Sequence, residues 1–382
     1  MKKIGIICEY NPFHNGHIYH LQKIKELYPD SIIILVMSGN FTMRGELSLL
    51  NKWDKTRLAL LYGVNLVIEL PLYYATNSAD IFAEGAIKIL NAMHCDYLIF
   101  GSECNDVSLL THLADIQLHN LTYDEKVRFY MDKGYNYPTS MSKALQDIDG
   151  KTINLPNDLL GLSYIKQIML TNSSITPITI QRTNDYHDKN NQCVIASATS
   201  IREAIQNNQD ITHNVPKETL EWIIKKDYQK NYFIFLRYQI LNNIDSLNTF
   251  LDVDEGLDNL IRKNIMKATS LNELILLMKT KRYTYNRLNR MFNHVLLNMR
   301  KNNVKEYKKI NYLRVLGFDK KGSSYLKSIK GKTSIPIITN YSDIDDKNLT
   351  LEQYTTYIYN MIIERNDLNI REIKSIPIQK ND

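Results

Sequence analysis

Five short apolar segments alternate with amphipathic segments over the first half of the chain, and this alternation restricts the fold more than any other feature. The apolar segments are rich in β-branched residues and predict buried strands at residues 2–8, 31–38, 64–71, 95–102 and 175–182. The intervening segments predict helices, among them 17–28, 51–63, 78–94 and 155–170. We therefore expect an α/β, Rossmann-like fold, whose parallel sheet is covered by helices on both faces. Because right-handed crossovers bring the carboxyl ends of the strands to one edge, ligands should bind along that edge.

The alternation ends near residue 210, and the charge balance changes at the same point. Residues 1–210 contain 18 Lys and Arg against 22 Asp and Glu, whereas residues 211–382 contain 29 against 19. Helical patterns follow at 218–242, 256–268, 271–280 and 284–299. We therefore expect two domains, one at 1–210 that holds the sheet and a mainly helical, basic one at 211–382. A basic surface suits a polyanionic partner, although an ordinary solvated surface would explain it as well.

Composition excludes several classes of protein. The sequence has no run of 18 apolar residues, so we expect no membrane-spanning helix, and the apolar start at 4–8 is too short for a signal peptide. Cys8, Cys95, Cys104 and Cys193 are widely spaced without a C-x-x-C pair, so neither a disulfide framework nor a zinc site is expected. These features favour the cytoplasm. No motif in the sequence identifies a protein partner or a metal site formed by the protein alone.

His14, Asn15, Gly16 and His17 form an H-x-G-H sequence between the first predicted strand and the helix after it. A helix N-terminus there would offer free backbone N–H groups and a partial positive charge to a phosphate, and glycine would let the ligand approach the backbone. Two imidazoles three positions apart can donate to one α-phosphate as pyrophosphate leaves. We therefore predict that His14 and His17 are catalytic. For one such histidine alone, a capping or surface role would be the simpler interpretation.

The segment S-A-T-S-I-R at 197–202 predicts a second helix start. Its hydroxyls and backbone amides could hold the β- and γ-phosphates, and the guanidinium of Arg202 would add a cation. We predict phosphate contacts from Ser197, Thr199, Ser200 and Arg202. Alone, the segment would fit an ordinary N-cap followed by an exposed arginine. Together with H-x-G-H, it predicts the second part of one ATP site.

The H-x-G-H turn is the signature of the nucleotidylyltransferase superfamily, and S-A-T-S-I-R resembles an element found in many of its adenylyltransferases. From about residue 4 to 317 the chain resembles one family in particular, the tRNA(Met) cytidine acetate ligases. The resemblance rests on EYNPFHNGH, MSGNFTMRGE, NKWDKTRLALLYGVNLVIELP, FGSE, LPNDLLGLSY, SATSIRE and KRYTYNRLNRMFNHVLL.

The resemblance implies an activity, substrates and a cofactor. Members of the family use ATP to convert acetate to acetyl-adenylate, with release of pyrophosphate. They then transfer the acetyl group to N4 of the wobble cytidine of elongator tRNA(Met), which becomes N4-acetylcytidine. The substrates implied here are therefore ATP, acetate and elongator tRNA(Met), with Mg²⁺ expected to bridge the phosphates.

The resemblance also implies which residues bind ATP. They are Ile7, Cys8, Glu9, Tyr10, Asn11, Pro12, Phe13, His14, Asn15, Gly16, His17, Ile18, Tyr19, His20, Gly101, Asn157 and Arg182. Two positions depart from the usual pattern. Cys8 stands where valine or another small apolar residue is expected, which should not affect the chemistry. Ala198 replaces a second serine, so one hydroxyl contact to phosphate is in doubt.

Two further regions bear on the other substrates. The segment 38–46 follows the second strand, where Arg44 or Asn40 would be placed to hold acetate, although the residues alone favour an exposed loop. Residues 281–332 contain 15 Lys and Arg against two acidic residues. There we predict tRNA contacts from Lys281, Arg282, Arg287 and Arg290, with Tyr283 and Tyr285 available for stacking. A solvated face of a packed helix would explain the same pattern.

Two other functions stay open from the sequence. A small-molecule adenylyltransferase, of the nucleotide or phosphopantetheine type, would share both phosphate motifs but has no need of a basic helical half. A non-catalytic RNA-binding protein with an inert nucleotide fold would bind tRNA without consuming ATP.

Overall fold

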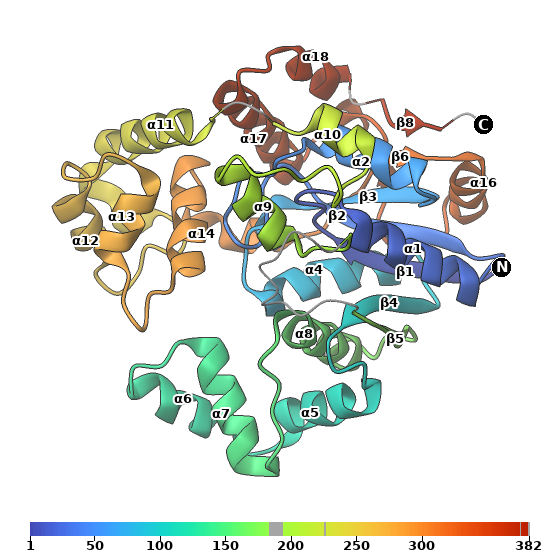
Figure 1. Ribbon diagram of the computed structural model, residues 1–382, viewed down its shortest axis with the longest axis horizontal. Coiled ribbons are helices and arrows are strands. Elements are labelled where there is room, and N and C mark those ends of the chain that lie inside the picture. The colour runs from blue at the N-terminus through green and yellow to red at the C-terminus, as the bar shows by residue number, and fades with distance from the viewer. Residues whose placement is uncertain (183–193, 225–226, 375, 381–382) are drawn as a thin grey trace.

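The computed structural model describes residues 1–182, 194–224, 227–374 and 376–380. Within them, eight strands form one sheet in the order β5-β4-β1-β2-β3-β6-β7, with β8 paired to β6 (Figure 1). All neighbouring strands are parallel except β3 and β6. The strands are β1 Lys3–Cys8, β2 Ile32–Ser38, β3 Leu66–Leu70, β4 Tyr97–Ser102, β5 Thr176–Gln181, β6 Leu313–Phe318, β7 Ile337–Ile338 and β8 Ile378–Gln379. The predicted α/β fold and its first five strands are confirmed.

Helices cover the sheet and extend beyond it. In the first half they are α1 Asn15–Leu27, α2 Lys52–Leu61, α3 Leu72–Ala75, α4 Ala79–Ala92, α5 Val107–His119, α6 Tyr123–Asp132, α7 Tyr137–Asp149, α8 Pro156–Leu170 and α9 Ala198–Gln206. In the second half they are α10 Lys217–Trp222, α11 Gln229–Asn242, α12 Leu257–Asn264, α13 Leu271–Met278, α14 Tyr285–Leu296, α15 Val304–Tyr307, α16 Lys320–Ile329, α17 Lys347–Ile363 and α18 Asp367–Lys374. Single 3₁₀ turns occupy Ile244–Thr249, Lys301–Asn303 and Tyr341–Asp343.

Strand β2 explains how the central sheet is covered on both faces. All seven of its residues are buried, as expected for a strand inside a parallel sheet. Ile32, Ile34 and Val36 belong to the core that includes α4, whereas Ile33 and Leu35 belong to the core that includes α1 and α2. Alternate side chains of one strand therefore pack against opposite helical layers.

The second half of the chain also contributes to the sheet. Strand β6 pairs with β3, and helices α11 to α14 share a hydrophobic core with β2 and β3. The predicted change to a helical pattern after residue 210 missed β6, β7 and β8. The sheet and this core both extend across residue 210. The division into two domains at that residue therefore stays a prediction.

Two other expectations concern the whole chain. Among the described residues, we find no helix that is both long enough and apolar enough to cross a membrane. Cys8, Cys95 and Cys104 are free thiols, and Cys193 lies outside the described residues.

Candidate active site

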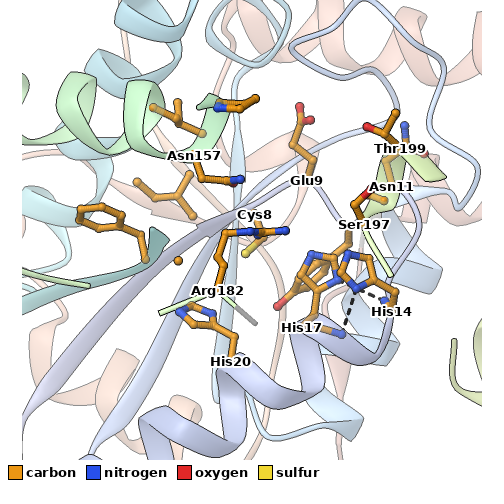
Figure 2. A pocket seen from close by; sticks show the side chains of 18 of the residues that line it. Cys8, Glu9, Asn11, His14, His17, His20, Asn157, Arg182, Ser197 and Thr199 are labelled. Atoms are coloured by element: carbon orange, nitrogen blue, oxygen red, sulfur yellow. Dashed lines mark hydrogen bonds between the residues drawn. The ribbon is translucent and has the colours of Figure 1, made fainter. Parts of the chain in front are cut away.

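A pocket of about 260 Å³ opens at the carboxyl edge of the sheet, where β1, β4 and β5 end (Figure 2). Starts of α1, α8 and α9 close it, so residues far apart in sequence meet there. The predicted ATP residues that line it are Ile7, Cys8, Glu9, Tyr10, Asn11, His14, Gly16, His17, Tyr19, His20, Gly101, Asn157 and Arg182. Pro12, Phe13, Asn15 and Ile18 do not line it. Phe13 belongs to the core, and the Asn15 amide donates to the carbonyls of Val194 and His213.

The two histidines of the H-x-G-H turn form a capping box at the start of α1. The backbone N–H of Gly16 donates to Nδ1 of His14 at 3.0 Å, and the backbone N–H of His14 donates to Nδ1 of His17 at 3.1 Å. The ring centroids are 3.8 Å apart. Because each Nδ1 accepts a hydrogen bond, the proton of each neutral ring must sit on Nε2.

Burial keeps both imidazoles uncharged. It lowers the pKa of His14 to about 3, aided by the charges of Arg182 and Arg202. It lowers the pKa of His17 well below the usual value, with smaller effects from His14 and His20. The pair therefore presents two Nε2–H donors near neutral pH, which suits an anion that must be bound without being protonated.

Gly16 is needed for a reason that differs from the sequence interpretation. A Cβ at this position would lie 2.7 Å from Cε1 of the His14 ring. The missing side chain thus makes room for the imidazole of His14, rather than for a ligand.

Helix α9 supplies the second predicted phosphate site, and it faces the same pocket. Ser197, Thr199 and Arg202 line the pocket. Ser197 caps α9 by accepting the N–H of Ser200 at 3.1 Å, while the Ser200 hydroxyl donates to the Ser197 carbonyl. Ser200 is buried outside the pocket lining, so its hydroxyl serves the cap. The motifs at 14–17 and 197–202 therefore meet, as predicted.

Two arginines converge on Thr199. Nη1 of Arg44 lies 3.1 Å from the Thr199 hydroxyl, and Nη2 of Arg202 lies 3.3 Å from it. Arg202 also donates to the Asn11 carbonyl at 2.8 Å and pairs with Glu46 at 2.9 Å. These bonds join the H-x-G-H turn, α9 and the 38–46 loop into one cationic wall.

Gly101, Asn157 and Arg182 form the opposite wall, beside the ends of β4 and β5. The Arg182 chain packs over Gly101, where a Cβ would meet its Cγ at 3.3 Å. Asn157 donates to Glu103 at 2.5 Å, and Nε of Arg182 lies 3.8 Å from the same carboxylate. Glu103 thus orients both predicted ligands, a role that its place in the FGSE segment does not reveal.

An apolar part of the pocket was not predicted. Phe82, Phe100, Leu160 and Tyr164 line it, next to Pro156 and Ile180. In the sequence these residues sit in helical or strand patterns and are indistinguishable from core residues. Only the fold reveals that they face a cavity.

The 38–46 loop is mostly buried, so the interpretation of an exposed loop is wrong. Arg44 lines the pocket, but Asn40 does not. The Asn40 amide donates to Thr356 at 3.2 Å and accepts the N–H of Lys52 at 2.9 Å. Asn40 therefore anchors the loop, which leaves Arg44 as the better placed of the two for acetate.

The predicted tRNA residues lie apart from the pocket, at and before α14. Lys281 and Arg282 are exposed. Arg282 and Arg287 both pair with Glu255, the latter at 3.4 Å. Arg290 is half-buried and points to the carbonyl of Met43 at 3.5 Å, so it also supports the 38–46 loop.

Stacking on Tyr283 is not supported by its surroundings. The ring is only 8% exposed and lies 5.0 Å from the Arg287 guanidinium, while its hydroxyl donates to Glu255. Tyr285 is half-buried. The Tyr283 ring therefore lacks the open face that stacking needs, and stacking on Tyr285 stays a prediction.

Among the described residues, no cluster of three or more His, Cys, Asp or Glu side chains could hold a metal ion.

Comparisons with known proteins agree with this geometry. Residues 1–373 match the family model described as HIGH Nucleotidyl Transferase. The chain is 41% identical to a tRNA(Met) cytidine acetate ligase of Caldicellulosiruptor saccharolyticus, over 87% of this chain and 86% of that protein. It is 37% identical to the ligase of the same name from Anoxybacillus flavithermus, over 99% and 100%.

Solved structures of a protein named TmcAL are also similar to this chain. The apo crystal structure of Thermotoga maritima TmcAL superposes with a TM-score of 0.89 at 28% identity, covering 99% of each chain. A second structure of that protein, bound with alpha-thio ATP, gives a TM-score of 0.88 and covers 100% of each chain.

Proposed function

Because this chain belongs to the HIGH nucleotidyl transferase family and to the tRNA(Met) cytidine acetate ligases, we propose that it acetylates elongator tRNA(Met) with acetate and ATP. The product is N4-acetylcytidine at the wobble position, and the by-products are AMP and pyrophosphate. One observation carries the proposal for the site. The imidazoles of His14 and His17 are neutral, and each accepts a backbone N–H at Nδ1. Each ring therefore has its Nε2–H group free to donate to a ligand in the pocket that both histidines line.

In the first step, a carboxylate oxygen of acetate attacks the α-phosphorus of ATP. The new O–P bond forms as the bond from phosphorus to the bridging oxygen of pyrophosphate breaks. Nε2–H of His14 and of His17 donate to the α-phosphate oxygens, where negative charge builds up. The start of α1 adds its backbone dipole. No covalent bond to the protein is needed.

The other predicted ligands have separate tasks in this step. Ser197, Thr199 and Arg202 hold the β- and γ-phosphates at the start of α9. Gly101, Asn157 and Arg182 hold the rest of ATP, together with the pocket-lining residues Ile7, Cys8, Tyr10, Asn11, Gly16, Tyr19 and His20. Arg44, which lies beside Thr199, attracts the acetate carboxylate. A small carboxylate is a weak ligand, so a cation that lines the pocket is the simplest way to concentrate it there.

Mg²⁺ belongs to the proposal as an ion that would be held by the triphosphate and by water molecules. It prefers six oxygen ligands and keeps water molecules, so a pocket with few carboxylates fits an ion held by the triphosphate itself. When bound, it neutralises charge on the leaving pyrophosphate.

In the second step, the amine N4 of cytosine attacks the acetyl carbonyl of acetyl-adenylate, and AMP leaves. The wobble base must leave its stack to reach the pocket. The cytosine amine is a poor nucleophile, because its lone pair is delocalised into the ring. Activation of acetate as a mixed anhydride explains why ATP is required.

The tRNA is held outside the pocket in this proposal, by basic residues of the second domain, 211–382. Lys281 and Arg282 are exposed on the turn before α14, and Arg287 and Arg290 follow on that helix. Phosphate contacts from such residues position a nucleic acid without reading its sequence. The cytoplasm, where free tRNA, acetate and ATP occur together, is the proposed location.

The test is to incubate the protein with ATP, acetate and elongator tRNA(Met) and to analyse the tRNA by mass spectrometry. We expect a gain of one acetyl group on the wobble cytidine that requires both ATP and acetate. Exchange of labelled pyrophosphate into ATP should likewise require acetate. Exchange that requires a nucleotide or phosphopantetheine substrate would favour a small-molecule adenylyltransferase, and tRNA binding without AMP release would favour an inert binding protein.

A further inference from the structure

Glu9 is the one carboxylate among the described residues that line the pocket. It follows β1 directly, and its side chain is held by the loop that follows β2. Oε1 accepts the backbone N–H of Met43 at 2.6 Å and lies 3.5 Å from the Ser38 hydroxyl. Its main-chain carbonyl accepts Nζ of Lys55 at 3.0 Å. These bonds fix one carboxylate oxygen and leave the other, Oε2, for a ligand.

The Glu9 carboxylate lies apart from the two imidazoles that would hold the α-phosphate (Figure 2). In Figure 2 its carboxylate points away from the two imidazoles and lies between Asn157 and Thr199. A carboxylate placed among the phosphates would repel them, so this part of the pocket suits a substrate that brings hydrogen-bond donors. The exocyclic amine of cytosine is such a donor, and carboxylates are the side chains that typically accept from it.

Acetyl transfer needs a group that takes a proton, and the other pocket side chains serve this purpose poorly. His14 and His17 already use Nδ1 as acceptors and carry protons on Nε2. Burial lowers the pKa of His20 to about 4. Burial raises the pKa of Cys8 to about 12 and that of Tyr164 well above its usual value, so both keep their protons. The arginines are always protonated.

We propose that Glu9 is the catalytic base of the acetyl-transfer step, accepting the proton that cytosine N4 loses. This inference rests on the proposed function. As N4 forms a bond with the acetyl carbon, one N–H proton passes to the Glu9 carboxylate. The bond between that carbon and the AMP oxygen then breaks, and AMP leaves with the electron pair. Glu9 afterwards releases its proton to solvent.

The surroundings of Glu9 favour this role. Burial raises its pKa, which brings it closer to neutral, where a general base is most effective. The Met43 N–H, Lys55 and Arg44 oppose the rise, and Glu46 adds to it. Lys55 on α2 and Arg44 and Glu46 of the 38–46 loop are the charged groups that face Glu9 from these elements.

The experiment compares Glu9→Gln with the wild type in each half-reaction separately. Acetate-dependent exchange of pyrophosphate into ATP reports the first step. Single-turnover transfer from preformed acetyl-adenylate to tRNA reports the second. We expect exchange within about threefold of wild type and transfer reduced by about 10²- to 10⁴-fold, the usual range for loss of a general base. Glu84→Gln, on α4 outside the pocket, is the matched control for the amide substitution and should leave both rates unchanged.

A second variant covers the case in which Glu9→Gln folds poorly. Glu9→Asp keeps a carboxylate but shortens it, so transfer should fall less than in Glu9→Gln and should keep its dependence on pH. In the wild type the transfer rate should rise with pH until Glu9 is ionised and then level off. The Gln variant should lack this rise.

Three results would overturn the inference. Transfer at the wild-type rate in Glu9→Gln would mean that another group, such as the AMP phosphate, takes the proton. Loss of exchange as well as transfer would place Glu9 in the ATP or Mg²⁺ step. If the wild type shows no acetate-dependent exchange at all, the proposed function fails and the inference fails with it. If the wild type shows exchange but Glu9→Gln does not slow transfer, only the inference fails.

Discussion

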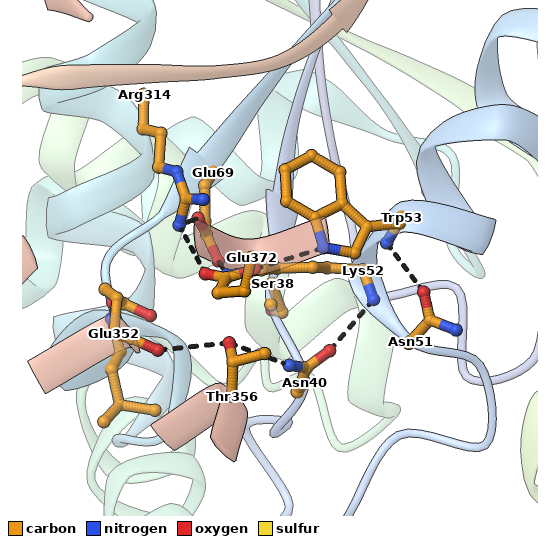
Figure 3. Close-up of polar contacts among 12 residues, drawn as sticks. Ser38, Asn40, Asn51, Lys52, Trp53, Glu69, Arg314, Glu352, Thr356 and Glu372 are labelled. Carbon is orange, nitrogen blue, oxygen red and sulfur yellow. Dashed lines mark hydrogen bonds and ion pairs between the residues drawn. The ribbon is translucent and has the colours of Figure 1, made fainter. Parts of the chain in front are cut away.

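Two groups of buried polar side chains lie near the carboxyl ends of the central strands, and they differ in how their hydrogen-bonding capacity is used. The buried ion cluster consists of Lys52, Glu69, Arg314 and Glu372 (Figure 3). Lys52 contacts Glu69 at 3.0 Å and Glu372 at 2.7 Å, while Arg314 contacts the same two carboxylates at 2.8 and 3.1 Å. None of the four is more than 4% exposed. Each charge therefore has two opposite partners inside the protein.

The pocket residues have the opposite character. His14 and His17 use one ring nitrogen each for the fold and present the other to the cavity. Nε2 of His20 is buried without a hydrogen-bond partner. The charges of the ion cluster are therefore compensated inside the protein, whereas each pocket histidine keeps one ring nitrogen for a ligand.

The largest expected effect comes from breaking the ion cluster. Glu372→Ala leaves Lys52 and Arg314 with one carboxylate between them and removes the link from α18 to α2 and β6. Removing one partner of a buried pair costs about 3–5 kcal/mol. The free energy of unfolding, measured by denaturant titration, should fall by that amount. The folded fraction of the variant should bind ATP with the same affinity as the wild type. Lys374→Ala, an exposed change on the same helix, is the control, and an equal effect there would refute the comparison.

Next in size is the loss of a pocket donor. His17→Asn keeps an acceptor for the His14 N–H but removes Nε2–H. Acetate-dependent pyrophosphate exchange should fall by about 10²- to 10³-fold, as for an oxyanion donor. The melting temperature and tRNA affinity should barely change. His119→Ala, on the exposed face of α5, serves as the control. A large loss of stability in His17→Asn would mean that the histidine serves the fold and not the ligand.

The neutral imidazoles also predict how stability depends on pH. Because the folded-state pKa of His14 is about 3, the unfolded chain binds this proton more readily between about pH 3 and the usual histidine pKa of about 6.5. Stability should therefore decline as the pH falls below about 6.5. His14→Asn, which can still cap α1, should make this decline shallower. Melting temperatures from pH 4.5 to 7.5 test this, and identical slopes would contradict it.

The smallest effect is expected at the surface. Lys281→Ala combined with Arg282→Ala should weaken tRNA binding several-fold and reduce its dependence on salt by about one unit of slope per lost phosphate contact. Pyrophosphate exchange should not change. These two are cleaner targets than Arg290, which also contacts the pocket loop. Lys263→Ala with Lys267→Ala is the matched control, and an equal loss there would place the tRNA site elsewhere.

The sequence predicted those parts of the fold that depend on local pattern. Strands β1 to β5 are continuous apolar runs between helices, so they could be assigned directly. Strand β6 was missed because Arg314 interrupts its apolar run. That arginine is buried only because Glu69 and Glu372, from distant segments, compensate its charge. Such pairing is decided by the tertiary structure and leaves no local signal.

The same distinction applies to the site. The motifs at 14–17 and 197–202 were recognisable because their chemistry lies within a few consecutive residues. The convergence of Arg44 and Arg202 on Thr199, the orienting role of Glu103 and the apolar wall around Tyr164 depend on contacts between segments. Asn40 was misread for this reason, since its partners Lys52 and Thr356 come from elsewhere in the fold.

The central claim is that the two histidines and the start of α9 grip one triphosphate. A crystal structure with α,β-methylene ATP tests it most directly. Nε2 of both His14 and His17 should lie about 3 Å from α-phosphate oxygens, with the outer phosphates at Ser197, Thr199 and Arg202. A nucleotide whose α-phosphate binds away from both rings, or whose outer phosphates point away from α9, would contradict the account.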